Sequence, residues 1–191
     1  MPITELDQRT ALVVIDLQKG ILRYPVVHPV EPVIANSVRL IKAFRERNLP
    51  VVLVNVGFAP DFADAVKTRT DAAKNTPPMQ LGPDFAEYLD ELDVQPSDIK
   101  VHKRNWNAFY GTALDLQLRR RGVTGIVLCG IATSIGVEST ARSAWEHNYQ
   151  IAFATDAMAD MSEENHNRSL AGIFPRLGEV GTTDDIIAKL K

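Results

Sequence analysis

Residues 125–146 read GIVLCGIATSIGVESTARSAWE, and this stretch decides the expected fold. It begins with an apolar run, Ile126 to Cys129, of the kind that a fully buried strand shows. The run breaks at Gly130. The residues that follow at the spacing of one helix face are Val137, Thr140, Ala141, Ala144 and Trp145. The pattern predicts a strand, a tight loop and a helix. Because the first N–H groups of a helix are unpaired, such a loop can bind an anion, although most such loops do no chemistry.

The composition indicates one globular domain spanning residues 1–191. Apolar residues make up 45% of the chain, which is enough for a sizeable core. The formal net charge of −3 argues against nucleic acid or an anionic membrane as the main partner. The single cysteine leaves no internal disulfide. The N-terminal residues show neither a signal-peptide pattern nor a membrane span, so we expect a cytoplasmic protein.

Strands and helices are expected to alternate along the chain. Short apolar, β-branched runs predict six strands, at residues 11–15, 51–56, 99–102, 126–129, 150–155 and 179–181. Amphipathic spacing and end signals predict helices at residues 32–47, 83–92, 112–121, 137–146, 162–174 and 183–190. The segment 57–82 contains several glycines and prolines without sustained periodicity, which is typical of a long loop that can act as a lid.

This alternation predicts a three-layer α/β fold in which a six-stranded, mostly parallel sheet has helices on both faces. Ligands of such sheets bind beyond the carboxyl ends of the strands. The residues expected at those ends are Asp16, Asn55 with Phe58, Lys103, the loop 130–136 and Asp156. Asp16 and Lys103 follow different strands and carry opposite charges, so they could meet at this edge and share a proton. A turn cap at Asp16 and a solvated charge at Lys103 are the ordinary alternatives.

Three motifs in order carry a family resemblance. They read ALVVIDLQ at residues 11–18, KRNWNAFYGT at 103–112 and GIATSIGVESTAR at 130–142. With these motifs, nearly the whole chain resembles the isochorismatase-like, or cysteine hydrolase, superfamily, and within it the YecD-like group of uncharacterised hydrolases. The superfamily also includes nicotinamidases and carbamoylsarcosine amidohydrolases. The resemblance implies a Rossmann-type parallel sheet, a homo-oligomer (a dimer or higher), and a cis peptide between Ile131 and Ala132.

One position departs from the family pattern. Amidases of the family use an Asp, a Lys and a Cys. Asp16 and Lys103 match the first two, whereas Gly136 occupies the position of the cysteine. Glycine supplies no nucleophile, so the resemblance implies that a thioester mechanism is closed at this position. The only thiol, Cys129, is expected to be a buried hydrophobe in a strand. Ser134, a better candidate for a helix cap, and Ser139 are weak hydroxyl substitutes.

Isochorismatases of the family also carry glycine at this position. Cleavage of a vinyl ether needs a proton at the vinyl carbon and a water molecule at the resulting oxocarbenium ion, but no protein nucleophile. Asp16 would be the general acid; burial would raise its pKa, and the ammonium of Lys103 would oppose that shift. Lys103 would hold a substrate carboxylate or orient Asp16. Gly136 would leave room for a ring.

Further residues could contact a small-molecule substrate. The candidates are Gln18, Phe58, Trp106, Phe109 and Tyr110, together with the loop residues Ile131, Ala132, Thr133 and Ile135. Core packing is the alternative for the aromatic residues, and we expect at least one of Trp106, Phe109 and Tyr110 to be only that. The four histidines, at positions 28, 102, 147 and 166, have no helical metal spacing, so we expect neither a metal nor another cofactor.

The sequence therefore favours a small-molecule hydrolase without a cysteine nucleophile, whose acid–base chemistry rests on Asp16 and Lys103. The substrate class suggested by the resemblance is an isochorismate-like carboxylate. Two alternatives remain open: a catalytically silent protein that binds a metabolite, and an amidase that uses Cys129 or a serine.

Overall fold

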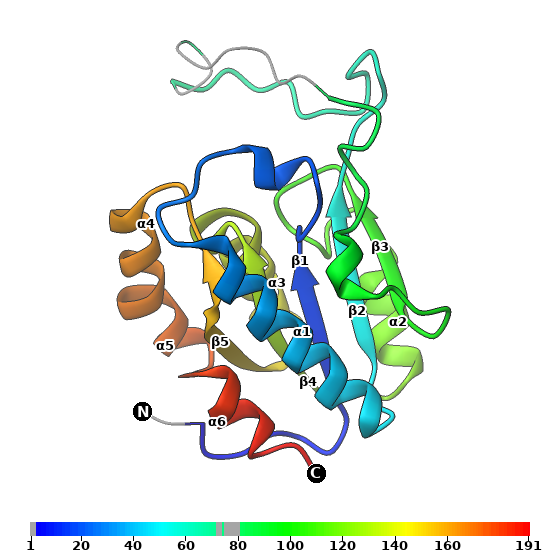
Figure 1. Cartoon of the computed structure of the whole chain (residues 1–191), viewed down its shortest axis with the longest axis vertical. Coiled ribbons are helices and arrows are strands. Elements are labelled where there is room, and N and C mark those ends of the chain that lie inside the picture. The colour runs from blue at the N-terminus through cyan, green and yellow to red at the C-terminus, as the bar shows by residue number, and fades with distance from the viewer. Residues whose placement is uncertain (1–2, 72–73, 75–80) are drawn as a thin grey trace.

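The computed structural model describes residues 3–71, 74 and 81–191, and its centre is a six-stranded sheet (Figure 1). All strand pairs are parallel, in the order β3-β2-β1-β4-β5-β6. The strands are β1 (Thr10–Ile15), β2 (Val51–Val56), β3 (Ile99–Lys103), β4 (Gly125–Ile131), β5 (Gln150–Ala159) and β6 (Glu179–Gly181). The predicted parallel α/β architecture is confirmed.

The α-helices cover both faces of this sheet. They are α1 (Val30–Glu46), α2 (Leu114–Arg120), α3 (Glu138–Glu146), α4 (Glu163–Arg168), α5 (Phe174–Leu177) and α6 (Thr183–Ile187). Short π-helical turns, η4 (Thr133–Val137) and η5 (Ser169–Ile173), precede α3 and α5, and 3-10 turns lie at η1 (Ile21–Arg23) and η3 (Asp90–Leu92). Within the described residues, no helix has the length and apolar character needed to cross a membrane.

The alternation of side chains along each strand divides the core in two. Leu12 and Val14 of β1 point to the layer that contains α1 and α6. Ala11, Val13 and Ile15 point to the opposite layer, where α2, α3 and α5 pack. All five residues are at most 1% exposed. Because β1 lies inside the sheet and is covered on both faces, its whole length reads as an apolar run.

The central stretch folds as strand, turn and helix, with two details that the spacing alone does not give. The expected cis peptide between Ile131 and Ala132 is present. Gly130, at the strand's end, has a φ of +117°, and a Cβ atom there would lie 2.0 Å from the carbonyl oxygen of Ile15. Glycine is therefore required where β4 passes β1, because any side chain would collide with the neighbouring backbone.

Two expectations were wrong. The chain does not form a helix over 83–92; it makes turns, pairs Tyr88 with Gln18 in an antiparallel bridge, and becomes helical only at η3. That bridge competes with a helix because it needs extended backbone. The other concerns β5, which does not end at Thr155. Its register against β4 shifts between Leu128 and Gly130, and the strand continues to Ala159.

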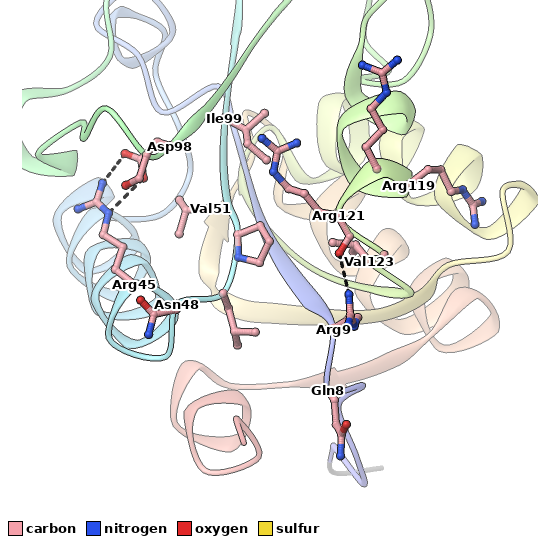
Figure 2. A pocket seen from close by; sticks show the side chains of 15 residues that line it. Gln8, Arg9, Arg45, Asn48, Val51, Asp98, Ile99, Arg119, Arg121 and Val123 are labelled. Carbon is pink, nitrogen blue, oxygen red and sulfur yellow. Dashed lines mark hydrogen bonds and ion pairs between the residues drawn. The ribbon is translucent and has the colours of Figure 1, made fainter.

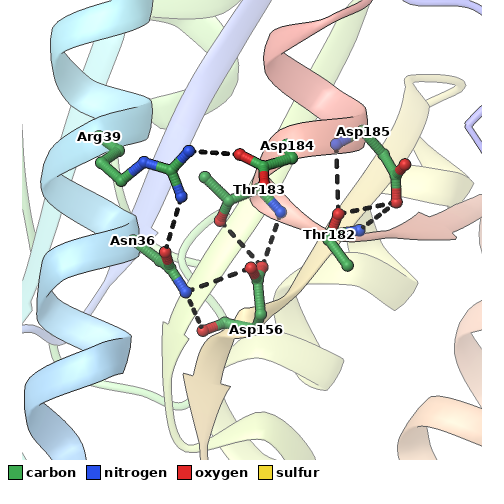
Figure 3. Close-up of polar contacts among 7 residues, drawn as sticks. All are labelled: Asn36, Arg39, Asp156, Thr182, Thr183, Asp184 and Asp185. Atoms are coloured by element: carbon green, nitrogen blue, oxygen red, sulfur yellow. Dashed lines mark hydrogen bonds and ion pairs between the residues drawn. The ribbon is translucent and has the colours of Figure 1, made fainter.

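Asp156 consequently lies inside β5 and not beyond its carboxyl end. Its Oδ1 accepts hydrogen bonds from the backbone N–H of Thr183 (2.7 Å) and from the Thr183 hydroxyl (2.9 Å). Its Oδ2 accepts one from Asn36 Nδ2 at 3.2 Å (Figure 3). The carboxylate thus joins α6 to α1 and is a structural group rather than a ligand contact.

The predicted lid segment, 57–82, is described only in part. Residues 72–73 and 75–80 lie outside the described residues, so the expectation of a lid stays a prediction. Residues 57–71 make turns and extend beyond the carboxyl edge of the sheet (Figure 1).

We predict that Asp156→Ala lowers the free energy of unfolding by about 1–3 kcal/mol, because it leaves the buried Thr183 hydroxyl and N–H without their acceptor. Urea denaturation measures this. The matched control is Asp184→Ala, which removes an ion pair with Arg39 whose carboxylate is 77% exposed, and which should cost less than about 1 kcal/mol. Equal losses in the two variants would contradict the role assigned to Asp156.

Candidate active site

The carboxyl edge of the sheet brings Asp16 and Lys103 together. Asp16 directly follows β1 and Lys103 ends β3, so the lysine side chain reaches past β2 to the acid. Lys103 Nζ lies 2.7 Å from Asp16 Oδ2. The two residues are 2% and 5% exposed. This is a buried ion pair made by two strands that are not neighbours in the sheet.

The other hydrogen bonds of Lys103 and Asp16 leave one carboxylate oxygen of Asp16 without a partner among the described residues. Lys103 Nζ also donates to the carbonyl oxygen of Asn105 at 3.1 Å. Asp16 Oδ1 is buried and has no hydrogen-bond partner in the part of the chain that the structure describes. A buried, unpaired carboxylate oxygen is costly, so it is an unusual feature and points to a group that the site receives.

The backbone conformation of Asp16 sets the direction of its carboxyl group. Asp16 has a φ of +51°, the left-handed region that residues other than glycine seldom adopt. Its N–H still donates to Val54 of β2 at 3.0 Å, so the turn begins immediately after the last ladder bond. Such a conformation costs about 1 kcal/mol or more and is typical of functional sites.

Burial raises the pKa of the Asp16 carboxyl from its ordinary 3.8 to about 6, and the adjacent Lys103 ammonium opposes this shift. The acid is therefore partly protonated near neutral pH. The pKa of Tyr88 is raised to about 12, first by burial and then by the negative charge of the Asp16 carboxylate. Its hydroxyl donates to the carbonyl of Leu53 at 3.0 Å.

Gly136 faces this acid. A Cβ atom built on Gly136 would lie 3.4 Å from Asp16 Oδ2 and 2.9 Å from Ile15 Cγ2. Any side chain at this position would therefore project against the carboxyl group, as a nucleophile paired with Asp16 would have to do. With glycine, no side chain lies between Ile15 and the Asp16 carboxyl group.

The loop that holds Gly136 uses most of its own donors. Ile135 and Val137 N–H groups donate to the carbonyl of Ala132 at 3.2 and 3.1 Å. The N–H of Ser134 donates to Asp160 Oδ2 at 2.6 Å. The Ser134 side chain makes no cap bond, so the expectation that it caps the helix was wrong. Ile131 and Ala132 are buried at the start of this loop.

His166, one of the four histidines without a metal spacing, supports the loop that holds Gly136. The Thr133 hydroxyl donates to Ala159 O at 3.0 Å and lies 2.8 Å from His166 Nδ1. His28 packs on His166 with ring centroids 4.7 Å apart. Burial, and then His28, lower the pKa of His166, which favours its neutral form. No spacing in the sequence links these residues, because three separate segments meet here.

The side chain of Gln18 makes hydrogen bonds to backbone groups. It is fully buried; its Nε2 donates to Val56 O (2.9 Å) and Phe85 O (2.6 Å), and its Oε1 accepts from Val56 N (2.7 Å). Both ends of the amide are in use, so Gln18 ties the segment at Phe85 to the end of β2 and does not present its amide to a ligand.

The aromatic candidates divide into core and exposed residues. Phe109 is buried and packs on His147 and Tyr149, with centroids 5.2 and 5.8 Å away, so it belongs to the core. Trp106 and Tyr110 are 67% and 70% exposed. Phe58 is half-buried against Phe62. Among the described residues, no cluster of three or more His, Cys, Asp or Glu side chains could hold a metal.

Comparisons with known proteins show the family of this chain. A family model described as the isochorismatase domain matches residues 10–185. The isochorismatase family protein YecD of Escherichia coli, itself uncharacterised, is 46% identical, with 97% of this chain and 99% of the relative covered. The predicted resemblance, including the YecD-like group, is confirmed.

Solved structures are similar as well. An isochorismatase family protein from Burkholderia thailandensis has a TM-score of 0.91 at 46% identity and covers 99% of this chain and 98% of its own. N-carbamoylsarcosine amidase from Thermoplasma acidophilum has a TM-score of 0.75 at 29% identity, with 92% and 97% covered.

We predict that the stability advantage of the wild type over Asp16→Asn falls as the pH rises from about 4 to 7. Because the pKa of Asp16 is raised on folding, the folded protein keeps the proton at pH values where the unfolded chain has lost it. The contribution of Asp16 to the free energy of unfolding is therefore complete below the unfolded pKa of 3.8, and it is lost as the pH rises to about 6. Urea denaturation of both proteins across this range measures the difference between their free energies of unfolding. The other titrating groups are the same in both proteins, so their effects cancel in this difference. A difference that is flat or rises with pH would contradict the raised pKa.

Proposed function

The chain belongs to the isochorismatase family, and we propose from this premise that it is a small-molecule hydrolase that works without a cysteine nucleophile. Asp16 is the general acid, Lys103 its partner, and Gly136 the position at which the amidases of the family carry their cysteine. One observation carries the proposal: Asp16 Oδ1 has no partner among the described residues, while Oδ2 of the same carboxyl group lies between Lys103 and Gly136, which has no side chain.

This arrangement suits the hydrolysis of a vinyl ether on a carboxylate-bearing substrate. Protonated Asp16 delivers its proton to the vinyl carbon, and the electrons of the double bond form the new C–H bond. Water adds to the resulting oxocarbenium ion and gives a hemiketal after it loses a proton. The C–O bond of the hemiketal then breaks to release an alcohol and a ketone. Each step balances without a covalent enzyme intermediate, and none needs a cofactor.

Lys103 serves both protonation states of the acid. An ammonium group has three donors, and two of them go to Asp16 Oδ2 and to Asn105 O. The third is available to a substrate carboxylate. After proton transfer, the new Asp16 carboxylate lies 2.7 Å from the positive charge, which stabilises the products of that step.

The amidase alternative that uses Cys129 lacks an accessible nucleophile. Cys129 is fully buried within β4, where its Sγ lies 3.9 Å from the Ser37 hydroxyl. Burial raises the pKa of this thiol to about 12, so it stays protonated and unreactive. The similarity to an amidase therefore supports the shared framework more than shared chemistry.

A silent metabolite-binding protein is the second candidate function, favoured by the missing nucleophile alone. It would use the same residues, Asp16 and Lys103, to hold a carboxylate-bearing molecule. The family resemblance also supports a homo-oligomer, a dimer or higher, acting in the cytoplasm on a small molecule.

We predict that isochorismate is hydrolysed by the wild type and that Asp16→Asn lowers this rate at least about 100-fold, because the proton donor is lost. Chromatography of the products measures the turnover. The exposed Asp184→Asn variant is the control and should keep full activity. Full activity of Asp16→Asn would overturn the general-acid assignment, whereas ligand-induced stabilisation without any turnover would favour the silent binding protein.

Gly136→Cys separates the two chemistries. We predict that this variant hydrolyses nicotinamide or a carbamoyl compound that the wild type leaves intact, since its thiol would project toward Asp16. Gly136→Ala is the matched control; it meets the same methyl of Ile15 but supplies no sulfur. Circular dichroism checks that both fold. Equal amide hydrolysis in the Cys and Ala variants would contradict the assignment of this position.

The pH dependence follows from the raised pKa. Because the acid must be protonated, we predict that kcat/KM falls about tenfold per pH unit above about 6. Rates measured between pH 5 and 9 test this, and a rate that rises over this range would show that Asp16 acts as a base.

A further inference from the structure

A concave site lies at the amino edge of the sheet, at the opposite end of the strands from Asp16 and Lys103. It is a groove of about 920 Å³ between the C-terminal ends of α1 and α2 (Figure 2). We call it the amino-edge groove. It is lined by Gln8, Arg9, Arg45, Asn48, Leu49, Pro50, Val51, Ser97, Asp98, Ile99, Arg119, Arg120, Arg121, Gly122 and Val123.

The groove is separate from the candidate active site. Arg9 directly precedes β1, and Asp16 directly follows it. At about 3.3 Å per residue, the strand places the two sites roughly 20 Å apart. Whatever binds in the groove therefore cannot touch the acid, and the two sites can be tested independently.

The charge in the groove is strongly one-sided. Five arginines line it, and Asp98 is the one acidic residue of the lining. Asp98 is already paired with Arg45, at 2.6 Å. Arg119 is paired with Asp115 at 3.2 Å and lies over the ring of Tyr149, 4.4 Å from its centroid. These contacts satisfy two of the five guanidinium groups.

The other three, Arg9, Arg120 and Arg121, form no ion pair with any acid in the described part of the chain. Arg9 Nη1 donates to the carbonyl of Arg121 at 3.4 Å. Arg121 Nη1 donates to Gln117, to its carbonyl at 3.0 Å and its side chain at 2.6 Å. These acceptors are neutral, so they leave the charges of Arg9 and Arg121 without a counter-ion in the described part of the chain.

The helix dipole explains only part of this charge. The C-terminal end of a helix carries a partial charge equivalent to about −0.5, which favours one cation in the last turn. At the end of α2, residues 119–121 are all arginine, and Arg9, which directly precedes β1, donates to the carbonyl of Arg121. The excess positive charge costs free energy in the empty protein, and a bound anion would remove that cost.

We propose that the amino-edge groove binds a small metabolite that carries two or more phosphate groups. A guanidinium matches a phosphate with two parallel N–H donors, and three unpaired guanidiniums suit more than one phosphate. The volume is that of a small-molecule site. The lining contains no aromatic ring on which a nucleobase of a single strand could stack, which argues against a nucleic acid.

The test uses inorganic pyrophosphate and tripolyphosphate as probes, with isothermal titration calorimetry on the full chain. We expect tripolyphosphate to bind more tightly than pyrophosphate, and binding to weaken as NaCl is raised. Arg9→Gln and the double variant Arg120→Gln/Arg121→Gln should each weaken binding at least about tenfold, the equivalent of one charged hydrogen bond. All three side chains are exposed, so these variants should fold.

Two controls isolate the groove. Arg168→Gln removes an exposed arginine from the end of α4 and should leave tripolyphosphate binding unchanged. Asp16→Asn alters the candidate active site and should also leave it unchanged, so failure of the proposed function would not disturb this result.

Three results would overturn the proposal. The first is the absence of binding at millimolar tripolyphosphate, and the second is binding that survives both groove variants. The third is tighter binding of another anion than of tripolyphosphate, with the same dependence on Arg9. The anions to compare are citrate, a polycarboxylate without phosphorus, and a single-stranded oligonucleotide. That outcome would keep the site but replace the ligand class.

Discussion

The contact on which the candidate site depends is the buried ion pair between Lys103 and Asp16. Two charges are stable in a protein interior only when geometry and further hydrogen bonds offset the loss of water. Here the order of the strands supplies the geometry, because β2 separates the two residues by the length of a lysine side chain. Asn105 supplies a second acceptor for the lysine. Within the described residues the acid has no corresponding second donor, and in the proposed function its free oxygen carries the proton that is transferred.

Glycine shapes this site at two points, for different reasons. Gly130 is needed by the fold, since its backbone lies against Ile15 where no Cβ fits and its φ is positive. Gly136 has no such backbone conflict. The contacts of a Cβ there would be a methyl group and the Asp16 carboxyl. The first glycine therefore says little about function, whereas a side chain at the second would require Ile15 to shift and would lie beside the Asp16 carboxyl group.

Much of the architecture could be predicted from the sequence, because strands buried on both faces read as continuous apolar runs and the runs alternate with amphipathic segments. The convergence of Asp16 and Lys103 followed from the rule for parallel sheets. Features that depend on contacts between distant segments were missed. Asp156 was misplaced because a register shift lengthens β5, and the support of Thr133 by His166 joins segments with no shared pattern. Gln18 was identified as polar and well placed, but its partners on β2 and near Phe85 are visible only in three dimensions.

The two edges of the sheet differ in a way that the topology does not require. In a parallel α/β fold, helix N-termini lie at the carboxyl edge and helix C-termini at the amino edge, so some positive side chains at the amino edge are expected. That expectation is met by Arg45, which also has an acidic partner, Asp98. Arg120 and Arg121 exceed it, because one helix end cannot neutralise consecutive cations and the chain as a whole is acidic, with a net charge of −3. A protein with that balance gains nothing in stability from gathering unpaired arginines, so their placement is better explained by a ligand than by the fold.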